Sequence, residues 1–229
     1  ADLLARFGWG RLTPGRLGLE LTTLVALLAV GGFSFFFVGH LGGEESLPRI
    51  DTIAADVSGR VTAQPLVDVA SVVTDLGALP TVAFAALLTA GWAVTRGRWI
   101  ETAALVCGVP LSSLAVHAAK AAYGRTRPED MLIEVDGSAY PSGHTVYAVA
   151  LVACATVLVR AGSGWAVRFA AVTVAIAAVV LVGLTRVYLR VHHFTDVLGG
   201  AALGFALWAL VGGIALVAGH VRHNGRPER

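Results

Sequence analysis

The stretch that decides the fold is 165–188, WAVRFAAVTVAIAAVVLVGLTRVY, in which seventeen uncharged residues separate Arg168 from Arg186. A helix that crosses the hydrocarbon core of a bilayer needs about 20 predominantly apolar residues. This stretch meets that requirement, and it ends in polar residues where a spanning helix would reach the membrane surface. We therefore predict that the chain is an integral membrane protein built from α-helices.

The composition of the whole chain supports this prediction. Of the 229 residues, 56% are hydrophobic and only 14% are charged, and the mean hydropathy is +0.73. Soluble domains average about 25% charged residues. The net charge of +2 and the lack of a basic run argue against a nucleic-acid partner. Cys107 and Cys154 lie within apolar runs, and we interpret them as small core residues rather than a disulfide or a metal pair.

Six apolar stretches are candidates for membrane spans. They predict an all-α fold, a six-transmembrane-helix bundle that forms a single domain over residues 1–229. No segment between them is long enough to form a separate soluble domain. The predicted spans are 18–39, 67–94, 99–121, 143–161, 165–188 and 196–219.

The segment between the first two predicted spans, about 40–66, shows helical periodicity. Apolar residues recur there on one helical face, and polar residues occupy the other. We expect a short helix in the outer interface, where it would border a route of lipid access. An ordinary covering loop is an equally good interpretation. The apolar set is Ile50, Ile53, Ala54, Val57 and Val61, and the polar set is Asp51, Thr52, Asp56, Ser58 and Arg60.

Basic residues are distributed unevenly between the two sides of the predicted bundle. If the N-terminus is cytoplasmic, ten lie on the cytoplasmic side and seven on the other, and three of those seven belong to the motifs described below. Cytoplasmic loops carry an excess of Lys and Arg. We therefore expect both termini in the cytoplasm and the motifs on the outer face. The cytoplasmic set is Arg6, Arg11, Arg16, Arg96, Arg98, Arg160, Arg168, Arg222, Arg226 and Arg229.

Three basic residues lie at or just beyond the outer ends of predicted spans. Lys120 lies near the end of the third span, Arg127-Pro128 follows after six residues, and Arg186 lies near the end of the fifth span. Fixed cations in a partly water-excluded cleft stabilise the charge of a phosphoryl group during its transfer. Snorkelling at the interface would explain any one of them alone. Three of them beside histidines favour a phosphate site.

A second motif, Pro141-Ser142-Gly143-His144, precedes the fourth predicted span. Ser142 is suited to cap the helix, so its hydroxyl and the first free amides can bind an anion. Gly143 lets the backbone approach that anion closely. His144 then lies in the first turn, where a protonated imidazole would give its proton to the leaving oxygen.

A third motif follows Arg186. His192 and Asp196 are four residues apart, which on a helix would place them on one face. A carboxylate bonded to one imidazole nitrogen makes the other nitrogen a better nucleophile. We expect His192 to attack phosphorus and Asp196 to orient it. His193, three residues from Asp196, is the competing nucleophile.

Several polar residues near the motifs receive no chemical role. Arg125, Arg190 and His117 are expected to border the cleft or to face lipid head groups. Asp75 lies inside the second predicted span, where an acid is a functional candidate by default. We favour a structural role for Asp75, because its surroundings in the sequence are polar.

Together the motifs resemble the signature of the type 2 phosphatidic acid phosphatase superfamily. That signature has a lysine separated by six residues from Arg-Pro, then Pro-Ser-Gly-His, then Ser-Arg followed by His and Asp at these spacings. Thr185 stands where the family usually has serine. The resemblance covers 120–196 and, through the six-span layout, nearly the whole chain. The matching residues are Lys120, Arg127, Pro128, Pro141, Ser142, Gly143, His144, Arg186, His192 and Asp196.

The resemblance implies a phosphatase that works through a phosphohistidine without a metal ion or another cofactor. It implies that His192 is the nucleophile, that Asp196 is its partner, and that His144 protonates the leaving group. His144 would later assist the water that hydrolyses the intermediate. The phosphate-binding residues that it implies are Lys120, Arg127, Ser142, Gly143 and Arg186.

From these motifs and the apolar spans we expect a lipid phosphatase of a bacterial cytoplasmic membrane, with its site at the outer leaflet and polyprenyl diphosphate as substrate. Phosphatidic acid and phosphatidylglycerol phosphate are close alternatives, and phosphoryl transfer to another lipid is a further one. A lipid or anion transporter is the alternative of a different class. The basic residues gather at one face rather than through the bilayer, which argues against transport. The sequence leaves the oligomeric state open.

Overall fold

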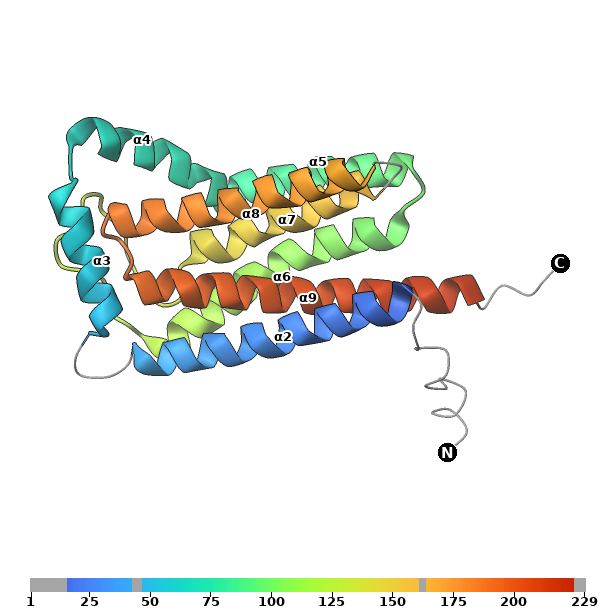
Figure 1. The fold of residues 1–229 in the computed structure, drawn as a ribbon, viewed down its shortest axis with the longest axis horizontal. Helices are drawn as coiled ribbons and strands as arrows, with labels where there is room; N and C mark the ends of the chain where they lie inside the picture. Colours follow the sequence, from blue (N-terminus) through green and yellow to red (C-terminus); the bar gives the residue numbers. More distant parts are fainter. Residues whose placement is uncertain (1–15, 43–46, 161–163, 225–229) are drawn as a thin grey trace.

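The structure, a computed structural model, describes residues 16–42, 47–160 and 164–224. These residues form a bundle of long helices that run roughly side by side, and α3 lies across one end (Figure 1). The all-α prediction is confirmed. The helices of the described ranges are α2 (Arg16–Leu41), α3 (Arg49–Arg60), α4 (Gln64–Thr74), the 3-10 turn η2 (Asp75–Gly77), α5 (Leu79–Thr95), α6 (Trp99–Tyr123), α7 (Gly143–Val159), α8 (Trp165–Tyr188) and α9 (Phe194–Asn224).

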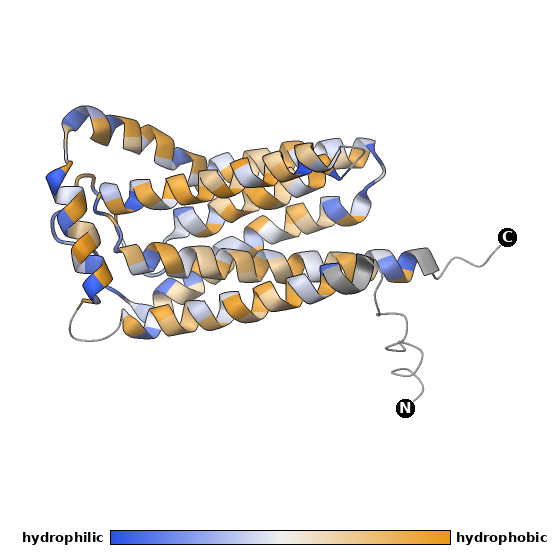
Figure 2. Ribbon diagram, in the orientation of Figure 1, coloured by the Kyte–Doolittle hydropathy of each residue, from blue (hydrophilic) through white to orange (hydrophobic). Residues whose placement is uncertain are grey.

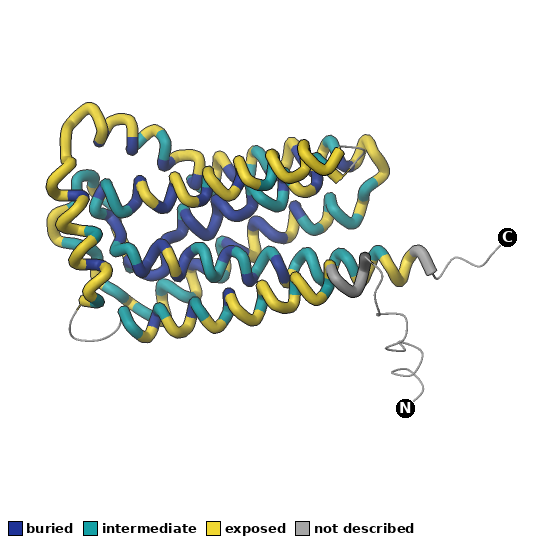
Figure 3. The backbone as a smooth tube through the Cα atoms, viewed as in Figure 1, coloured by how far each residue is buried: buried dark blue, intermediate teal, exposed yellow. Residues whose placement is uncertain are grey.

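Four of the described helices, α2, α6, α8 and α9, are long and apolar enough to cross a membrane. The pair α4 and α5 adds a fifth candidate if it is taken as one broken span. These helices consist largely of apolar residues (Figure 2). Many residues on the outside of the bundle are exposed (Figure 3), and they include many large apolar ones. Such a surface is stable in contact with lipid tails rather than with water. The chain is a multi-pass membrane protein.

The six-span layout differs from the structure in two places. The predicted span 67–94 is interrupted between α4 and α5, whose axes differ by 44°. A Cβ on Gly77 would lie 2.6 Å from the carbonyl oxygen of His144, so the chain can pass this point only as glycine. Pro80 then lies in the first turn of α5, where a missing N–H costs nothing. The predicted span 143–161 is also shorter than expected, because α7 has only 17 residues.

The core of the bundle is built around α7. Val146, Ala148, Val149 and Ala150 are nearly inaccessible, and the helix packs against α5, α6, α8 and α9 (Figure 3). Because protein surrounds α7, its first residue need not reach the membrane surface. Its start can therefore lie inside the bundle.

The two cysteines have different environments, and both are free. Cys154 is buried in the core next to α5, as predicted. Cys107 is exposed on α6, so its interpretation as a core residue is wrong. On a helix that faces lipid, an exposed position suits a small apolar side chain as well as a buried one does.

The segment that follows α2 contains a helix, as the periodicity indicated. Its polar residues divide into two groups, because Asp51 and Ser58 pack on the bundle while Thr52, Asp56 and Arg60 are exposed. Asp51 and Ser58 are buried, whereas Ile53 and Val57 are 51% and 55% exposed. The apolar side of α3 therefore points away from the protein.

Candidate active site

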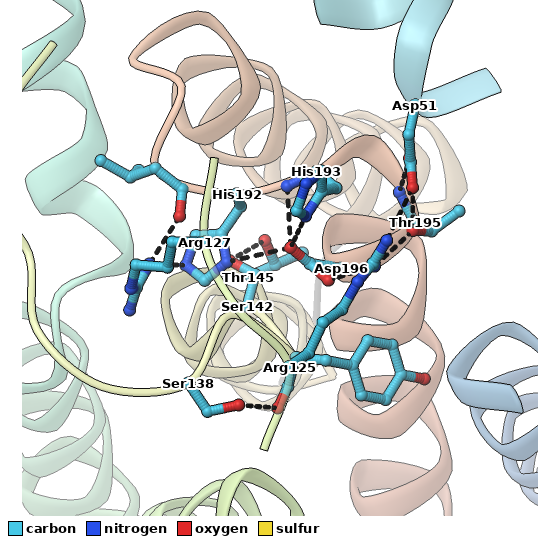
Figure 4. A network of polar contacts seen from close by, with 12 residues as sticks. Asp51, Arg125, Arg127, Ser138, Ser142, Thr145, His192, His193, Thr195 and Asp196 are labelled. Atoms are coloured by element: carbon cyan, nitrogen blue, oxygen red, sulfur yellow. Dashed lines mark hydrogen bonds and ion pairs between the residues drawn. The ribbon is translucent and has the colours of Figure 1, made fainter. Parts of the chain in front are cut away.

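The three predicted motifs come together at the end of the bundle that carries α3 (Figures 1 and 4). They are brought there by the last turns of α6 and α8, the first turns of α7 and α9, and the connections 124–142 and 189–193. Backbone hydrogen bonds join these connections to each other and to α9. The amide of Leu132 donates to Leu189 at 3.1 Å, and the amide of Ser142 donates to the carbonyl of Asp196 at 3.0 Å.

The end of α6 shows how the chain enters the site. Gly124 follows the helix with a φ of +58°, a left-handed conformation that glycine adopts without strain. The chain then reverses, and Tyr140 near the end of this connection packs against the rings of Phe35 and Tyr123. Its hydroxyl donates to the carbonyl of Phe35. The connection between α6 and α7 is thus fixed against α2.

Arg127 is held in place by backbone carbonyls. Its Nε donates to Gly137 at 2.9 Å, its Nη2 to Asp136 at 3.1 Å, and its Nη1 to Val191 at 2.5 Å. The same Nη1 lies 3.3 Å from Nε2 of His192 (Figure 4). Burial lowers the pKa of Arg127 from its usual value, but an arginine remains charged at neutral pH.

Arg186 and Lys120 complete a group of three cations. Arg186 is 2% exposed, its Nη1 donates to Thr74 at 3.3 Å, and its buried Nε has no hydrogen-bond partner among the described residues. Lys120 donates from Nζ to the carbonyl of Ser138 at 2.7 Å. The charges of Arg127 and Arg186 both act on Lys120, so the three groups share one electrostatic environment.

His192 lies in the connection before α9, and not on the helix itself. Its ring is nonetheless turned back, with Nδ1 3.6 Å from Oδ2 of Asp196. This distance is slightly too long for a hydrogen bond. The buried Nδ1 has no other partner in the described part of the chain, so Asp196 is the acceptor within its reach.

The protonation of His192 follows from its burial. Removal from water lowers its pKa to about 4, and the charges of Arg127 and Arg186 act in the same direction. The charge of Asp196 opposes the shift. The ring is therefore neutral at neutral pH, with one nitrogen free to act as a base or a nucleophile.

His193 also contacts Asp196. Its amide donates to Oδ2 at 2.7 Å, and its Nδ1 lies 3.3 Å from the same oxygen (Figure 4). The imidazole nearer to the carboxylate is thus that of His193, whereas the imidazole nearer to the cations is that of His192. The spacing left both histidines as candidates for the nucleophile, and the structure gives them different neighbours.

Ser142 is the N-cap of α7, as predicted. It is fully buried, and its hydroxyl accepts a hydrogen bond from Thr145 at 3.1 Å. The first amide bonded within the helix is that of Val146, which donates to Ser142. The amides of 143–145 precede it and lie at the positive end of the helix dipole. His144 is half buried there, and the charges of Arg186 and His192 act on it.

Two residues outside the motifs contact Asp196 directly or through one partner. Arg125 donates from Nη1 to Oδ1 of Asp196 at 2.6 Å and from Nη2 to Oδ2 of Asp51 at 2.9 Å. The sequence analysis gave Arg125 no chemical role and placed Asp51 only on a polar helix face. The available signal was weak, since it consisted of an arginine in the segment between Lys120 and Arg127 and an acid on a short helix.

The other polar residues that were singled out have different surroundings. Arg190 is paired with Asp130, and Nδ1 of His117 contacts the carbonyl of Ser113 on its own helix. Asp75 is exposed in η2, where its charge acts on Arg186. A separate cavity of about 790 Å³ opens at the opposite end of the bundle, and none of the motif residues lines it.

Comparisons with known proteins agree with this arrangement. Residues 101–215 match the model of the PAP2 superfamily. Over 92 residues the chain is 37% identical to phosphatidylglycerophosphatase B of Bacillus subtilis, a match that covers 39% of this chain and 45% of that relative. The chain thus aligns with less than half the length of that curated relative.

The fold is also similar to a solved structure, that of a transmembrane PAP2-type phosphatidylglycerolphosphate phosphatase from Bacillus subtilis. The TM-score is 0.71 and the identity is 25%, over 90% of this chain and 98% of that one. The resemblance drawn from the motifs is therefore confirmed. Because the family model spans half of the sequence and this fold covers most of it, the chain belongs to the PAP2 superfamily, as a multi-pass membrane member.

Proposed function

We propose that the protein is an integral-membrane lipid phosphatase that hydrolyses a phospholipid phosphate monoester, with phosphatidylglycerol phosphate as the favoured substrate. The observation that carries this proposal is the group of cations around His192. Among the described residues, Lys120, Arg127 and Arg186 form no ion pair with a carboxylate. Arg186 is buried and the other two are partly buried, and positive charge removed from water without a counter-charge is costly. A site that collects three such charges suits an anionic ligand.

In the first step, His192 is the nucleophile. A phosphoryl group held by Arg127 would lie beside Nε2 of His192, because the two groups are 3.3 Å apart. Attack by Nε2 forms a nitrogen–phosphorus bond and breaks the bond from phosphorus to the lipid oxygen. That oxygen takes a proton from His144. Asp196 accepts from Nδ1 of His192 and stabilises the cationic phosphohistidine.

In the second step, water replaces the histidine. His144, now neutral, takes a proton from the attacking water, and the nitrogen–phosphorus bond breaks to release inorganic phosphate. Throughout, the phosphoryl oxygens are held by fixed donors that need no reorganisation. These donors are Lys120, Arg127, Arg186, the hydroxyl of Ser142 and the amide of Gly143.

The named relatives bear on the choice of substrate. Both are phosphatases of phosphatidylglycerol phosphate, which supports a phospholipid monoester over the polyprenyl diphosphate expected from the sequence. A transporter needs polar groups along a path through the bilayer. The cations here converge on one histidine at one end of the bundle, which favours hydrolysis.

We further propose that the site faces the outer leaflet of a bacterial cytoplasmic membrane. The termini, 1–15 and 225–229, lie outside the described residues. The start of α2 and the end of α9 are nevertheless at the end of the bundle opposite α3 and the site (Figure 1). The basic connection between α5 and α6 lies at that same far end, as the charge bias requires.

The test is phosphate release by the purified protein in mixed micelles that contain a metal chelator. We expect release from phosphatidylglycerol phosphate, with kcat/KM at least about tenfold above that for phosphatidic acid or polyprenyl diphosphate. His192→Ala, verified as folded by circular dichroism, is the control and should be inactive. Release from none of these lipids would refute the proposal. So would a requirement for a divalent metal or for an acceptor lipid.

A further inference from the structure

Asp51 is a buried carboxylate that no motif contains. It lies on α3 and is only 2% exposed. Its Oδ1 accepts from the amide of Thr195 at 2.8 Å, and its Oδ2 accepts from the hydroxyl of Thr195 at 2.7 Å and from Arg125 at 2.9 Å (Figure 4). Burying an ionised carboxylate is costly unless such partners are present. Asp51 therefore caps the first turn of α9 from another helix.

Arg125 connects this cap to Asp196. Its guanidinium lies between two carboxylates, with Nη2 on Asp51 and Nη1 on Oδ1 of Asp196. The hydroxyl of Thr195 accepts a further bond from Nη1 at 2.7 Å. Arg125 thereby engages one oxygen of Asp196, and the other oxygen, Oδ2, is left for His192 and His193.

The far end of α3 is also fixed to the bundle. The hydroxyl of Tyr188, on α8, lies 3.3 Å from the carbonyl of Val61 and 3.3 Å from the amide of Ala63. Gly59 lies against Arg190, so that a Cβ there would be 2.8 Å from Nη2 of that arginine. Polar contacts at both ends thus determine how α3 sits on α8 and α9.

We propose that Asp51 is a positioning residue of the active site, which acts through Arg125 to hold Asp196 at the imidazole of His192. The helix α3 then contributes to catalysis, because it carries a residue that orients the catalytic pair. The inference rests on the proposed function, in which His192 attacks phosphorus. Asp51 itself touches neither the substrate nor the reacting atoms.

The substitution Asp51→Asn separates charge from shape. The amide keeps an acceptor for Thr195 but no longer binds Arg125 as an anion. Arg125 is then free to form a bidentate pair with Asp196, which is the preferred geometry of guanidinium and carboxylate. Such a pair recruits Oδ2 away from His192. The imidazole loses the acceptor that fixes its tautomer and orientation.

The first experiment compares D51N with D56N in the phosphate-release assay. Asp56 lies on the same helix, is exposed and undergoes the same chemical change. We expect D51N to lower kcat by about 10- to 100-fold, the size of effect that a small misplacement produces. KM should change by less than about threefold, because the phosphate-binding cations are untouched. D56N should match the wild type. If kcat of folded D51N equals that of D56N, the proposal is overturned.

A second variant covers the case in which D51N does not fold. Arg125→Lys keeps the positive charge, but a lysine is a point charge that cannot bridge two carboxylates with a fixed fork. The same fall in kcat with little change in KM is expected. Wild-type kcat in R125K would overturn the proposal.

The last measurement tests the effect of Asp51 on His192 without an activity assay. The ¹⁵N shifts of labelled imidazoles, assigned with H192Q, report at pH 7 which nitrogen of His192 carries the proton. We expect the Nδ1–H form in the wild type and in D56N, and a mixture of tautomers in D51N. If the wild type hydrolyses no lipid but this change is seen, the proposed function fails and the positioning role stands. An unchanged tautomer in D51N refutes the positioning role whatever the activity.

Discussion

At the scale of single residues, His192 and His193 differ in what they face. Asp196 accepts a hydrogen bond from the amide of His193 and lies closer to the ring of His193 than to that of His192. These contacts give His193 a structural role. The Nε2 atom of His192 instead faces Arg127. A nucleophile must lie beside the group that holds its target. This geometry favours His192 over its neighbour.

We therefore predict unequal effects of removing the two imidazoles. His192→Ala should lower kcat by at least about 10⁴-fold, because the covalent route is lost. His193→Ala should cost less than about 100-fold, since it perturbs only the contacts of Asp196. Phosphate release measures both losses of kcat, and trapping of a phosphoprotein with radiolabelled lipid after a rapid quench shows which variant still forms the intermediate. Phosphoprotein that forms in H192A but not in H193A would assign the nucleophile to His193.

The acid limb of the pH–rate profile is a second test of this residue. His192 must be neutral to attack, and its pKa of about 4 keeps it neutral at lower pH than an ordinary histidine. We expect kcat/KM to persist below pH 6 and to fall as the pH drops through about 4. In Arg127→Gln the limb should move to higher pH, because a cation that disfavours the protonated ring is gone.

The control for this profile is a measurement of folding over the same pH range, because the lowered pKa of His192 also affects stability. In the unfolded chain His192 takes up a proton near pH 6.5, and in the folded protein only near pH 4. The free energy of unfolding must therefore decrease as the pH falls between these values. Circular dichroism over the same range separates loss of fold from loss of chemistry. An acid limb near pH 6.5 in folded protein would contradict the assignment.

Some site residues could be predicted from the sequence and others could not. The difference is how far along the chain their partners lie. The motif residues were predicted because fixed spacings reveal a shared chemistry. Arg125 and Asp51 were not, because their meaning comes from partners 71 and 144 residues away in the chain. Nothing local distinguishes such residues from any other surface charge.

At the scale of helices, the break between α4 and α5 is the feature that hydropathy missed. A window of apolar residues averages over Gly77, yet this residue lets the chain pass close to α7. The break also brings Thr74 to Arg186. Likewise, periodicity predicted α3 but not which side of it would face the protein, because polar contacts of Asp51 outweigh its apolar residues.

Gly77→Ala is expected to damage both stability and activity. Its Cβ would lie 2.6 Å from the carbonyl of His144 and from Val182, and backbone on one side leaves little room to relax. We expect a loss of about 1–3 kcal/mol and a fall in kcat, because the start of α7 must shift. Thermal unfolding in detergent and phosphate release measure the two effects.

Gly91→Ala is the matched control, since a Cβ at Gly91 in α5 meets no atom within 4 Å. Its stability should stay within about 0.5 kcal/mol of the wild type. Equal stability and activity of the two variants would show that the close contact at Gly77 is unimportant.

At the scale of the whole molecule, the site lies at one end of the bundle and the basic α5–α6 connection at the other (Figure 1). The proposed orientation in the membrane can be tested on a background in which Cys107 and Cys154 are replaced. Glu129→Cys, in the exposed connection near the site, should react with an impermeant maleimide in intact cells. Thr95→Cys, at the end of α5, should react only after permeabilisation. The reverse pattern would contradict the proposed orientation.

The shortness of α7 determines the depth at which a lipid must present its phosphate. Its 17 residues rise about 25 Å, whereas the 24 residues of α8 rise about 36 Å. The two are joined at the far end, so the start of α7 is recessed roughly 10 Å below the rim that α8 reaches. A head group that sinks into this recess carries its tails no further into water. Extraction from the bilayer, which costs about 0.8 kcal/mol for each methylene exposed, is never required.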